Sequence, residues 1–414
     1  MDDVVLRTPA LEHTRPAGAS VALTLLAVTL VLAMSPWFSA SAVIPQLRTE
    51  WALSTTAAAW LTIAVQLGFV AGALLSSILN VADVIAPRHV IAGGAAGAAL
   101  VNGLLLAAGG GGQAIALRFL TGFFLAGVYP PAFKLMSTWF RRGRGVALGV
   151  LAGAITLGSA SPHLVNGLGG LDWRTVIAAT SIFTLGAGLL VEAAIREGPF
   201  PFPRAVFDPR QAGRILGNRG VMLASSGYFG HMWELYAMWA WFVVFFADYL
   251  RAHGAGGGPA AAYAAFAVIG MGAAGSWLAG IMGERWGRTR TTILMLAVSG
   301  SCAVLVGLLF DAPPWLVLAV SLLWGFAVVA DSARFSTMVT ELADQAYVGT
   351  ALTLQLAVGF SLTIATIWLI PVVQNLWGWR WAFAVLAPGP ALGVLAMLRL
   401  RALPEAKRIA GGLG

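Results

Sequence analysis

Residues 260–310 read AAAYAAFAVIGMGAAGSWLAGIMGERWGRTRTTILMLAVSGSCAVLVGLLF. The stretch holds two apolar runs, 260–282 and 290–310, joined by a short segment that carries Arg285, Arg288 and Arg290. An apolar run of about 20 residues is long enough to cross the hydrocarbon core of a bilayer as a helix. In lipid only a helix or a closed barrel satisfies its own backbone hydrogen bonds. The stretch therefore predicts two transmembrane helices joined by a basic loop.

The composition of the whole chain agrees with a lipid environment. Of 414 residues, 59% are hydrophobic and only 10% are charged, against about 25% charged in a typical soluble domain. The net charge of +8 lies in short clusters between apolar runs, which is typical of cytoplasmic loops and not of a nucleic-acid-binding face. Cys302 is the one cysteine, so we expect neither an intramolecular disulfide nor a metal site built on thiolates.

Runs of spanning length recur along the chain and predict an all-α membrane protein with twelve transmembrane helices. Residues 1–19 are polar, and the first run is too long for the apolar region of a signal peptide, so we expect it to remain as a span. The predicted spans are 20–46, 54–79, 89–109, 113–139, 143–168, 173–195, 220–247, 260–282, 290–310, 314–340, 347–374 and 380–400.

A polar segment near the middle of the chain divides it in two. Residues 196–219 contain four prolines and five arginines, a composition that favours a linker. The predicted organisation is an N-terminal tail (1–19), a first six-helix half (20–195), a cytoplasmic linker (196–219), a second six-helix half (220–402) and a C-terminal tail (403–414).

The distribution of arginine predicts the orientation. With both termini in the cytoplasm, nearly all arginines outside the spans, and Lys407, fall in cytoplasmic segments, as the positive-inside rule requires. The outer loops then hold only Arg48, Arg174, Arg251 and Arg380. We expect a multi-pass protein of the cell (inner or plasma) membrane.

The two halves look like copies of one unit. Trp173-Arg174 and Trp379-Arg380 open the sixth and twelfth spans, 206 residues apart, and similar landmarks recur at offsets of 204 and 201 residues. A nearly constant offset indicates a duplicated unit. Membrane halves of this kind rock against each other around a central site.

The segment from Gly280 to Arg290 resembles the loop motif Gly-x-x-x-Asp-Arg-x-Gly-Arg-Arg of the major facilitator superfamily. It lies between the eighth and ninth spans, where that family repeats the motif. A degraded copy after the second span keeps Asp83 and Arg88, and the fourth span resembles the family's arginine-containing motif at Arg118, Gly122 and Gly127. The resemblance implies a fold of two pseudo-symmetric six-helix halves.

It also implies a conformational latch, in which a loop carboxylate meets the amino end of a neighbouring helix and arginines hold the loop. The alternative is that the loop arginines only set the topology. The latch residues would be Asp83, Arg88, Glu284, Arg285 and Arg288.

In general layout the chain is distantly similar to the nitrate/nitrite and cyanate-type porters. Nitrate porters place an arginine inside the second and eighth helices, whereas 54–79 and 260–282 contain none. Nitrate binding is therefore not expected.

Titratable residues at membrane depth are the strongest functional signal, because a charge there costs at least ~2.5–3.5 kcal/mol. In the seventh span, His231 and Glu234 are three residues apart and share a helix face. We predict that Glu234 carries the coupling proton, with His231 tuning or sharing it; the alternative is a static structural pair. Tyr236 is expected at the cavity, and Trp241 in the aromatic belt.

In the tenth span, Asp331 and Arg334 are also three residues apart, and an internal ion pair is the simplest interpretation. Arg334 and Lys134 of the fourth span would alternatively face one cavity from the two halves and bind an anion, or extend to the cytoplasmic surface. Other candidate substrate-binding residues are His163 and Asn166 of the fifth span, Gln66 and Gln355.

These features predict a secondary transporter that works by alternating access, coupled to protons, for a small organic anion or zwitterion. A proton-driven exporter of hydrophobic compounds is the alternative within the class. A membrane-embedded enzyme would need paired aspartates, a metal box or a Ser/His dyad at motif spacing, which the sequence lacks, and no ATP-binding motif occurs. We expect a monomer with substrate, protons and lipid as partners, and with no cofactor, metal or nucleic acid.

Overall fold

The computed structural model describes residues 16–140, 143–168, 172–200, 208–344 and 347–414. Within these ranges ten helices are long and apolar enough to cross a membrane, and no strand occurs. The shorter apolar helix α1 (Ala19–Ala33) and the 34-residue helix α12 (Arg219–Ala252) complete the twelve spans. The fold is thus an all-helical membrane fold of two six-helix halves, as the sequence predicts.

The spans of the first half are α1 with α2 (Ser39–Ala42), α4 (Thr55–Ile78), α6 (Pro87–Gly103) with η1 (Leu104–Ala107), α7 (Gly111–Leu125) with α8 (Tyr129–Ser137), α9 (Arg144–Gly167) and α10 (Trp173–Ala194). Those of the second half are α12, α13 (Gly258–Trp286), α14 (Arg288–Leu308), α15 (Pro314–Ala330) with α16 (Ser332–Leu342), α17 (Val348–Trp377), and α18 (Trp379–Ala382) with η3 (Ala384–Leu386) and α19 (Pro388–Arg401). The short connecting elements are α3 (Ile44–Glu50), α5 (Val81–Val84), η2 (Pro209–Gln211), α11 (Ala212–Gly217) and η4 (Pro404–Gly412).

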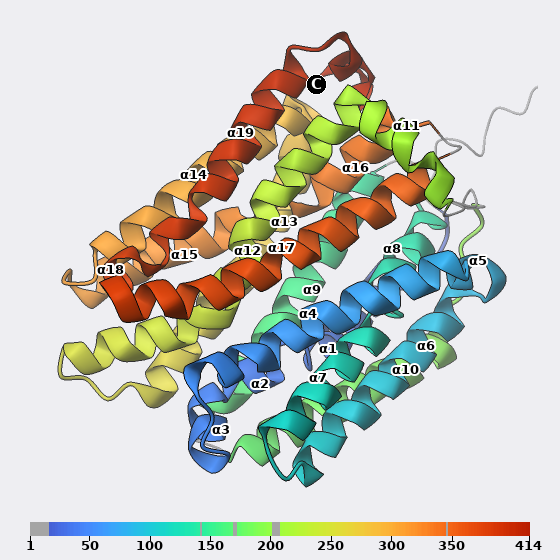
Figure 1. Ribbon diagram of the computed structural model, residues 1–414. Coiled ribbons are helices and arrows are strands. Elements are labelled where there is room, and N and C mark those ends of the chain that lie inside the picture. Colours follow the sequence, from blue (N-terminus) through green and yellow to red (C-terminus); the bar gives the residue numbers. More distant parts are fainter. Residues whose placement is uncertain (1–15, 141–142, 169–171, 201–207, 345–346) are drawn as a thin grey trace, which may run out of the picture.

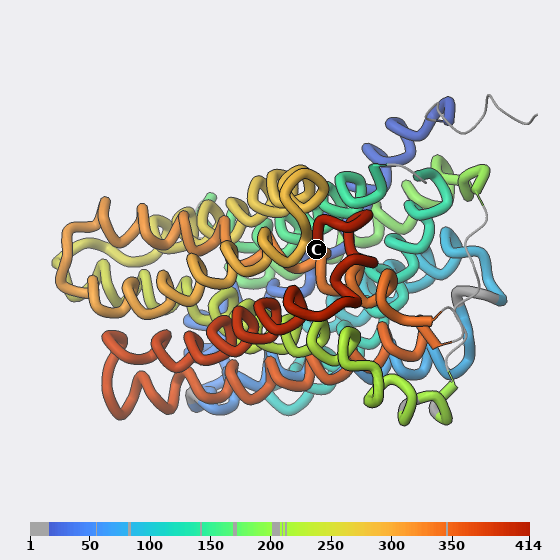
Figure 2. Tube along the Cα trace, turned by 90° about the horizontal axis from the view of Figure 1, so that it is seen from above, coloured from blue at the N-terminus to red at the C-terminus, as the bar shows by residue number. Residues whose placement is uncertain are grey.

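Polar residues just before the spans set where several helices begin. Ser54, Asp172 and Asn218 precede α4, α10 and α12, and each side chain accepts a hydrogen bond from a backbone N–H in the first turn. Such caps satisfy amides that have no partner inside the helix. The helices run roughly side by side, and the start of α1 lies toward the same end of the molecule as η4 (Figure 2). We call this the termini end.

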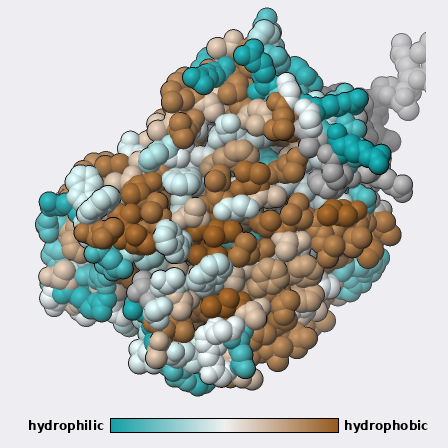
Figure 3. Space-filling view, viewed as in Figure 1, coloured by the Kyte–Doolittle hydropathy of each residue, from teal (hydrophilic) through white to brown (hydrophobic). Residues whose placement is uncertain are grey.

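Apolar side chains cover the outside of the bundle. Leu100, Ile182 and Leu392 are 65%, 68% and 64% exposed, which suits contact with lipid chains. On the face shown in Figure 3, hydrophobic residues predominate along the helices and hydrophilic ones gather toward the ends. The protein is therefore a multi-pass membrane protein.

The duplication is visible in how helices cross within each half. In the first half, a Cβ on Gly122 would lie 2.0 Å from the carbonyl oxygen of Val65; in the second half, one on Gly325 would lie 1.8 Å from that of Val268. A second crossing repeats it, with Gly72 on Phe123 and Gly275 on Phe326. All four positions recur after 203 residues (325 − 122). Small residues let membrane helices approach this closely.

The halves meet along α9 and α13, and along α4 and α17 (Figure 1). Gly149 and Gly153 of α9 face Ser276 and Ala273 of α13, with glycine Cβ positions 3.0 and 3.2 Å from the nearest backbone atoms. Near the termini end, the Ser77 and Thr353 hydroxyls lie 3.1 Å apart and join α4 to α17. The larger contact between the halves is thus lined by small residues.

Candidate functional site

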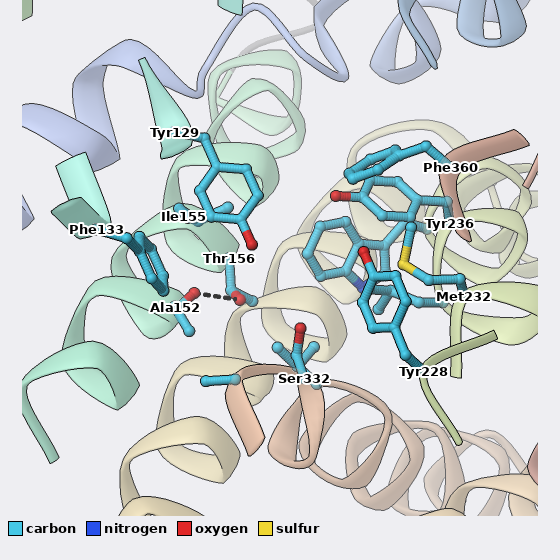
Figure 4. A pocket seen from close by; sticks show the side chains of 14 residues that line it. Tyr129, Phe133, Ala152, Ile155, Thr156, Tyr228, Met232, Tyr236, Ser332 and Phe360 are labelled. Atoms are coloured by element: carbon cyan, nitrogen blue, oxygen red, sulfur yellow. Dashed lines mark hydrogen bonds between the residues drawn. The ribbon is translucent and has the colours of Figure 1, made fainter. Parts of the chain in front are cut away.

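A cavity of about 40 Å³ lies between the two halves, near the middle of the spans. Six of its fourteen lining residues are aromatic, and its walls come from α8 and α9 of one half and α12, α15, α16 and α17 of the other (Figure 4). The aromatic lining residues are Tyr129, Phe133, Tyr228, Tyr236, Trp239 and Phe360. A space of this size holds water at most, so this conformation is closed around its centre.

A larger hollow of about 630 Å³ is bordered by Trp377, Trp381, Ala384 and Val385. It opens onto the molecular surface, where Trp377 and Trp381 are 64% and 48% exposed. Because it lies on one half only and has an apolar, lipid-type rim, the central cavity is the better candidate for a transport site.

The polar atoms that reach the central cavity are hydroxyls. Figure 4 shows the oxygens of Tyr129, Tyr228 and Tyr236 directed into the space, with the Ser332 hydroxyl facing them. None of the three phenol groups has a hydrogen-bond partner within the described part of the chain. The Thr156 hydroxyl donates to the carbonyl of Ala152, 2.9 Å away. Of the described side chains that line the cavity, none is charged.

Glu234 lies on the opposite side of α12 from the cavity, since Tyr228, Met232 and Tyr236 occupy the cavity face. Its side chain is 1% exposed. Trp324 Nε1 of α15 donates to Oε1 at 2.6 Å, and Ser299 Oγ of α14 donates to Oε2 at 2.9 Å. The carboxyl group therefore joins three helices of the second half, and sequence reasoning identified neither partner.

His231 pairs with Asp331, not with Glu234. Its Nδ1 lies 2.8 Å from Asp331 Oδ1, and both side chains are 1% exposed. The distance is that of an ion pair, although the angles fall outside those of a hydrogen bond. The prediction that Glu234 and His231 interact directly is wrong in this conformation, because their side chains contact different residues: Glu234 contacts Trp324 and Ser299, and His231 contacts Asp331. Asp331 lies at the break between α15 and α16, directly before the cavity residue Ser332.

The predicted ion pair of Asp331 with Arg334 is also wrong. Arg334 is 3% exposed and donates to the carbonyls of Ala279 (2.9 Å), Ser276 (3.3 Å) and Ala330. It therefore ties α16 to the backbone of α13. Neither Arg334 nor Lys134 lines the cavity, so the two cations do not form the anion site that the sequence suggested.

Two predicted amide residues bond to the protein elsewhere. Gln355 accepts from Ser336 at 3.3 Å and donates to Ser225 at 3.5 Å. Asn166 donates to the carbonyl of Ala42 at 2.9 Å and accepts from Gln46 at 3.3 Å. Both connect helices, and neither lines the cavity.

His163 and Gln66 are fully buried, and within the described residues none of their side-chain nitrogen and oxygen atoms has a hydrogen-bond partner. His163 lies on the face of α9 that carries the cavity residue Thr156 two turns earlier. Gln66 lies one turn from Phe69, whose ring is 4.5 Å from that of Phe360. Neither residue lines the cavity; both lie beyond its wall, on the side away from the termini end.

The prediction that Trp241 lies in the aromatic belt at the membrane surface is wrong. Trp241 is 4% exposed, and its Nε1 donates to the carbonyl of Ile367 at 2.8 Å. It therefore packs α12 against α17 and does not lie in a surface belt. Tyr236, by contrast, lies in the wall of the cavity.

Arg118 is the largest buried polar residue of the first half, with 0% exposure. Its guanidinium donates to Pro36 O (2.7 Å), Leu61 O (3.2 Å), Ser39 Oγ (3.2 Å) and Asn102 Oδ1 (3.2 Å), and to Trp37 O. These acceptors belong to the first three spans. The sequence marks Arg118 only through its motif. The break in the first span at residues 34–38, which supplies free carbonyls, contains Pro36, a helix-breaking residue that the predicted spans did not take into account.

The predicted latch residues fall into two groups at the termini end. Glu284 lies at the amino end of α9, where a Cβ on Gly145 would be 2.7 Å from its Oε1. Arg288 forms a two-pronged pair with Glu341 of α16, at 3.0 and 2.8 Å. The position of Glu284 suits a carboxylate beside a helix amino end. Arg285 is exposed.

The degraded copy is arranged differently. Arg88 contacts Glu197 at 3.6 Å, and the neighbouring His89 lies 2.8 Å from Glu192, so these residues join α6 to α10 and the segment after it. The side chain of Asp83 lies outside the described residues.

The chain matches the model of one known protein family. Residues 25–362 match the family model described as Major Facilitator Superfamily. A search among curated proteins found no match.

Several solved structures are similar to this chain in fold. They include a D-xylose–proton symporter (16% identity, TM-score 0.72, 93% of this chain and 98% of that chain covered) and the proton:xylose symporter XylE bound to 6-bromo-6-deoxy-D-glucose (14%, 0.70, 93% and 96%). A bacterial homologue of the human lysosomal transporter Spinster, in an inward-facing unoccupied conformation, is also similar (15%, 0.65, 94% and 96%). At these identities the likeness concerns the fold.

Proposed function

Because the chain belongs to the Major Facilitator Superfamily and is thus a membrane transporter, we propose that it is a proton-coupled secondary transporter working by alternating access. The central cavity is the substrate site, and Glu234 is the group that takes up and releases the proton. Proton coupling in two of the structural relatives supports the proposal.

The observation that carries this proposal is the pair of donors around Glu234. When the carboxylate is ionised, Ser299 Oγ–H and Trp324 Nε1–H each donate to one of its oxygens. When it is protonated, Oε2–H donates to Ser299 Oγ, which turns its own proton to the Leu296 carbonyl 3.2 Å away. Both protonation states are therefore hydrogen-bonded without moving a heavy atom, which a buried carboxyl requires if it is to exchange a proton.

We propose that the link from Glu234 to the cavity runs along α12 to His231, one turn earlier, and to its partner Asp331. His231 is adjacent in sequence to the cavity residue Met232, and Asp331 to Ser332. A substrate that moves α12 or the break before α16 would change the surroundings of this pair and then of Glu234. We place the coupling there.

One observation favours the second candidate, an exporter of hydrophobic compounds. The cavity wall is aromatic and, in its described part, uncharged, whereas an importer of organic anions would need a cation there. Import and export share this geometry, and the direction follows from which gradient the cell maintains. We further propose that the protein is a monomer of the cell membrane with both termini cytoplasmic.

The test is transport in proteoliposomes, with the compound that most stabilises the purified protein in a metabolite screen. With a pH gradient, the unaltered protein should concentrate this compound. Glu234→Gln should lose that accumulation and keep exchange of labelled for unlabelled compound. Glu192→Gln, the same change at an exposed carboxylate, is the matched control and should accumulate normally. Accumulation by Glu234→Gln would remove Glu234 from the coupling step.

A further inference from the structure

We infer that the substrate is a small uncharged molecule with a flat ring and with both hydrogen-bond donors and acceptors, as in an aromatic amide. The inference deepens the proposed function and rests on it, because it assigns a chemical class to the same cavity. It replaces the anion that the sequence suggested.

The first argument is the charge of the site. The two cations nearest in depth, Lys134 and Arg334, do not line the cavity, and Arg334 places its guanidinium against carbonyls of the neighbouring helix. The Asp331 carboxylate is held by His231. A charged substrate would enter a low-dielectric space with no opposite charge on the wall, which is unfavourable.

The second argument is the set of ring faces. Tyr129 and Phe360 contribute rings from opposite halves, and Tyr236 and Trp239 lie 5.5 Å apart between ring centroids. Rings in this arrangement favour a flat partner, which stacks or meets their edges. An aliphatic chain would bury equal area but would gain nothing from the quadrupoles of the rings.

The third argument is a group of buried polar atoms that lack partners. His163 and Gln66 have none within the described residues, and the indole nitrogens of Trp37 and Trp239 also have none there. Trp239 lines the cavity, and the ring of Trp37 lies 5.8 Å from those of both Tyr236 and Phe360.

Such atoms are uncommon in proteins and call for a specific explanation. Trp239 lines the cavity and Trp37 packs on its rings, while His163 and Gln66 lie one to two helical turns beyond its wall on one side. Together they offer donors from the two indoles, and both a donor and an acceptor from the imidazole and from the amide. An uncharged group that both donates and accepts, such as a carboxamide, matches this set.

The experiment has one arm without ligand. If the polar groups are kept for binding, replacing them should stabilise the empty protein, since an unpaired buried donor or acceptor is lost. We expect Gln66→Leu and His163→Leu to raise the melting temperature by about 1–3 °C. Asn102→Leu is the matched control: Asn102 is equally buried but fully bonded, so its loss should lower the melting temperature. Equal losses in all three variants would overturn the inference.

The second arm uses two matched series of probes at pH 7, benzamide with benzoate and benzylamine, and indole-3-acetamide with indole-3-acetate and tryptamine. The neutral member of a series should raise the melting temperature of the unaltered protein most, and Gln66→Leu and His163→Leu should each abolish that rise. Greater stabilisation by a charged member, or none by any probe, would overturn the inference. Thermal shifts need no proton gradient, so this outcome is independent of the test of Glu234.

Discussion

The charge pairs of the second half predict a definite pattern of stability losses. His231→Phe leaves the Asp331 carboxylate, which is 1% exposed, without its imidazole partner, and breaking a buried pair costs about 3–5 kcal/mol when both partners are charged. Adding Asp331→Asn removes the stranded charge. Since residues in direct contact couple by roughly 0.5–3 kcal/mol, the double variant should recover roughly 0.5–3 kcal/mol of the loss.

Arg334→Met should behave differently. Its two hydrogen bonds to α13, at about 0.6 kcal/mol each for contacts between membrane helices, are together worth roughly 1 kcal/mol. Adding Asp331→Asn should recover little, because the carboxylate already has His231. The assay is unfolding of the purified variants in mixed micelles with increasing sodium dodecyl sulfate, followed by circular dichroism. If Asp331→Asn rescues Arg334→Met and not His231→Phe, the charges pair as the sequence suggested and the reasoning from the structure fails.

Three further predictions concern stability, conformation and topology. Arg118→Met should cost roughly 3 kcal/mol, from five hydrogen bonds at about 0.6 kcal/mol each, while Arg174→Met at an exposed pair should cost under ~1 kcal/mol; equal unfolding midpoints would contradict this. Glu284→Ala should weaken a helix-end contact worth ~0.3–2 kcal/mol and raise labelling of cavity cysteines from the termini end; unchanged labelling would leave Glu284 as a simple loop charge. A cysteine at Arg290 should resist an impermeant reagent in intact cells while one at Arg380 reacts, and the reverse pattern would invert the proposed topology.

The sequence predicts the fold well because the relevant signals are local. A transmembrane span is recognised by about 20 consecutive apolar residues. Each of the twelve predicted spans corresponds to an observed helix or broken helix. The interruptions are harder to predict. The break at Asp331 occurs within apolar surroundings and depends on how neighbouring helices pack. The break at residues 34–38 contains Pro36, a local signal that the predicted spans did not use.

The site is predicted only as a set of residues. Spacing places His231 and Glu234 at the same depth, but three residues along a helix also turn the side chain by about 60°. That rotation directs one toward α15 and α16 and the other toward Ser299 and Trp324. Partners 65 and 90 residues away leave no local pattern in a single sequence.

The glycine-lined contact between α9 and α13 has a consequence for how the molecule moves. Long side chains that interlock across an interface must change rotamer before the two surfaces can slide, and each such change adds a barrier. At Gly149 and Gly153 the opposing surfaces are backbone and methyl groups. A rotation of one half about this line therefore requires few side-chain rearrangements. Inside each half, where backbone carbonyls lie directly against glycines, the helices cannot move past each other in the same way. Larger residues at 149 or 153 would slow the turnover of the transporter even where they left both the substrate site and the fold intact.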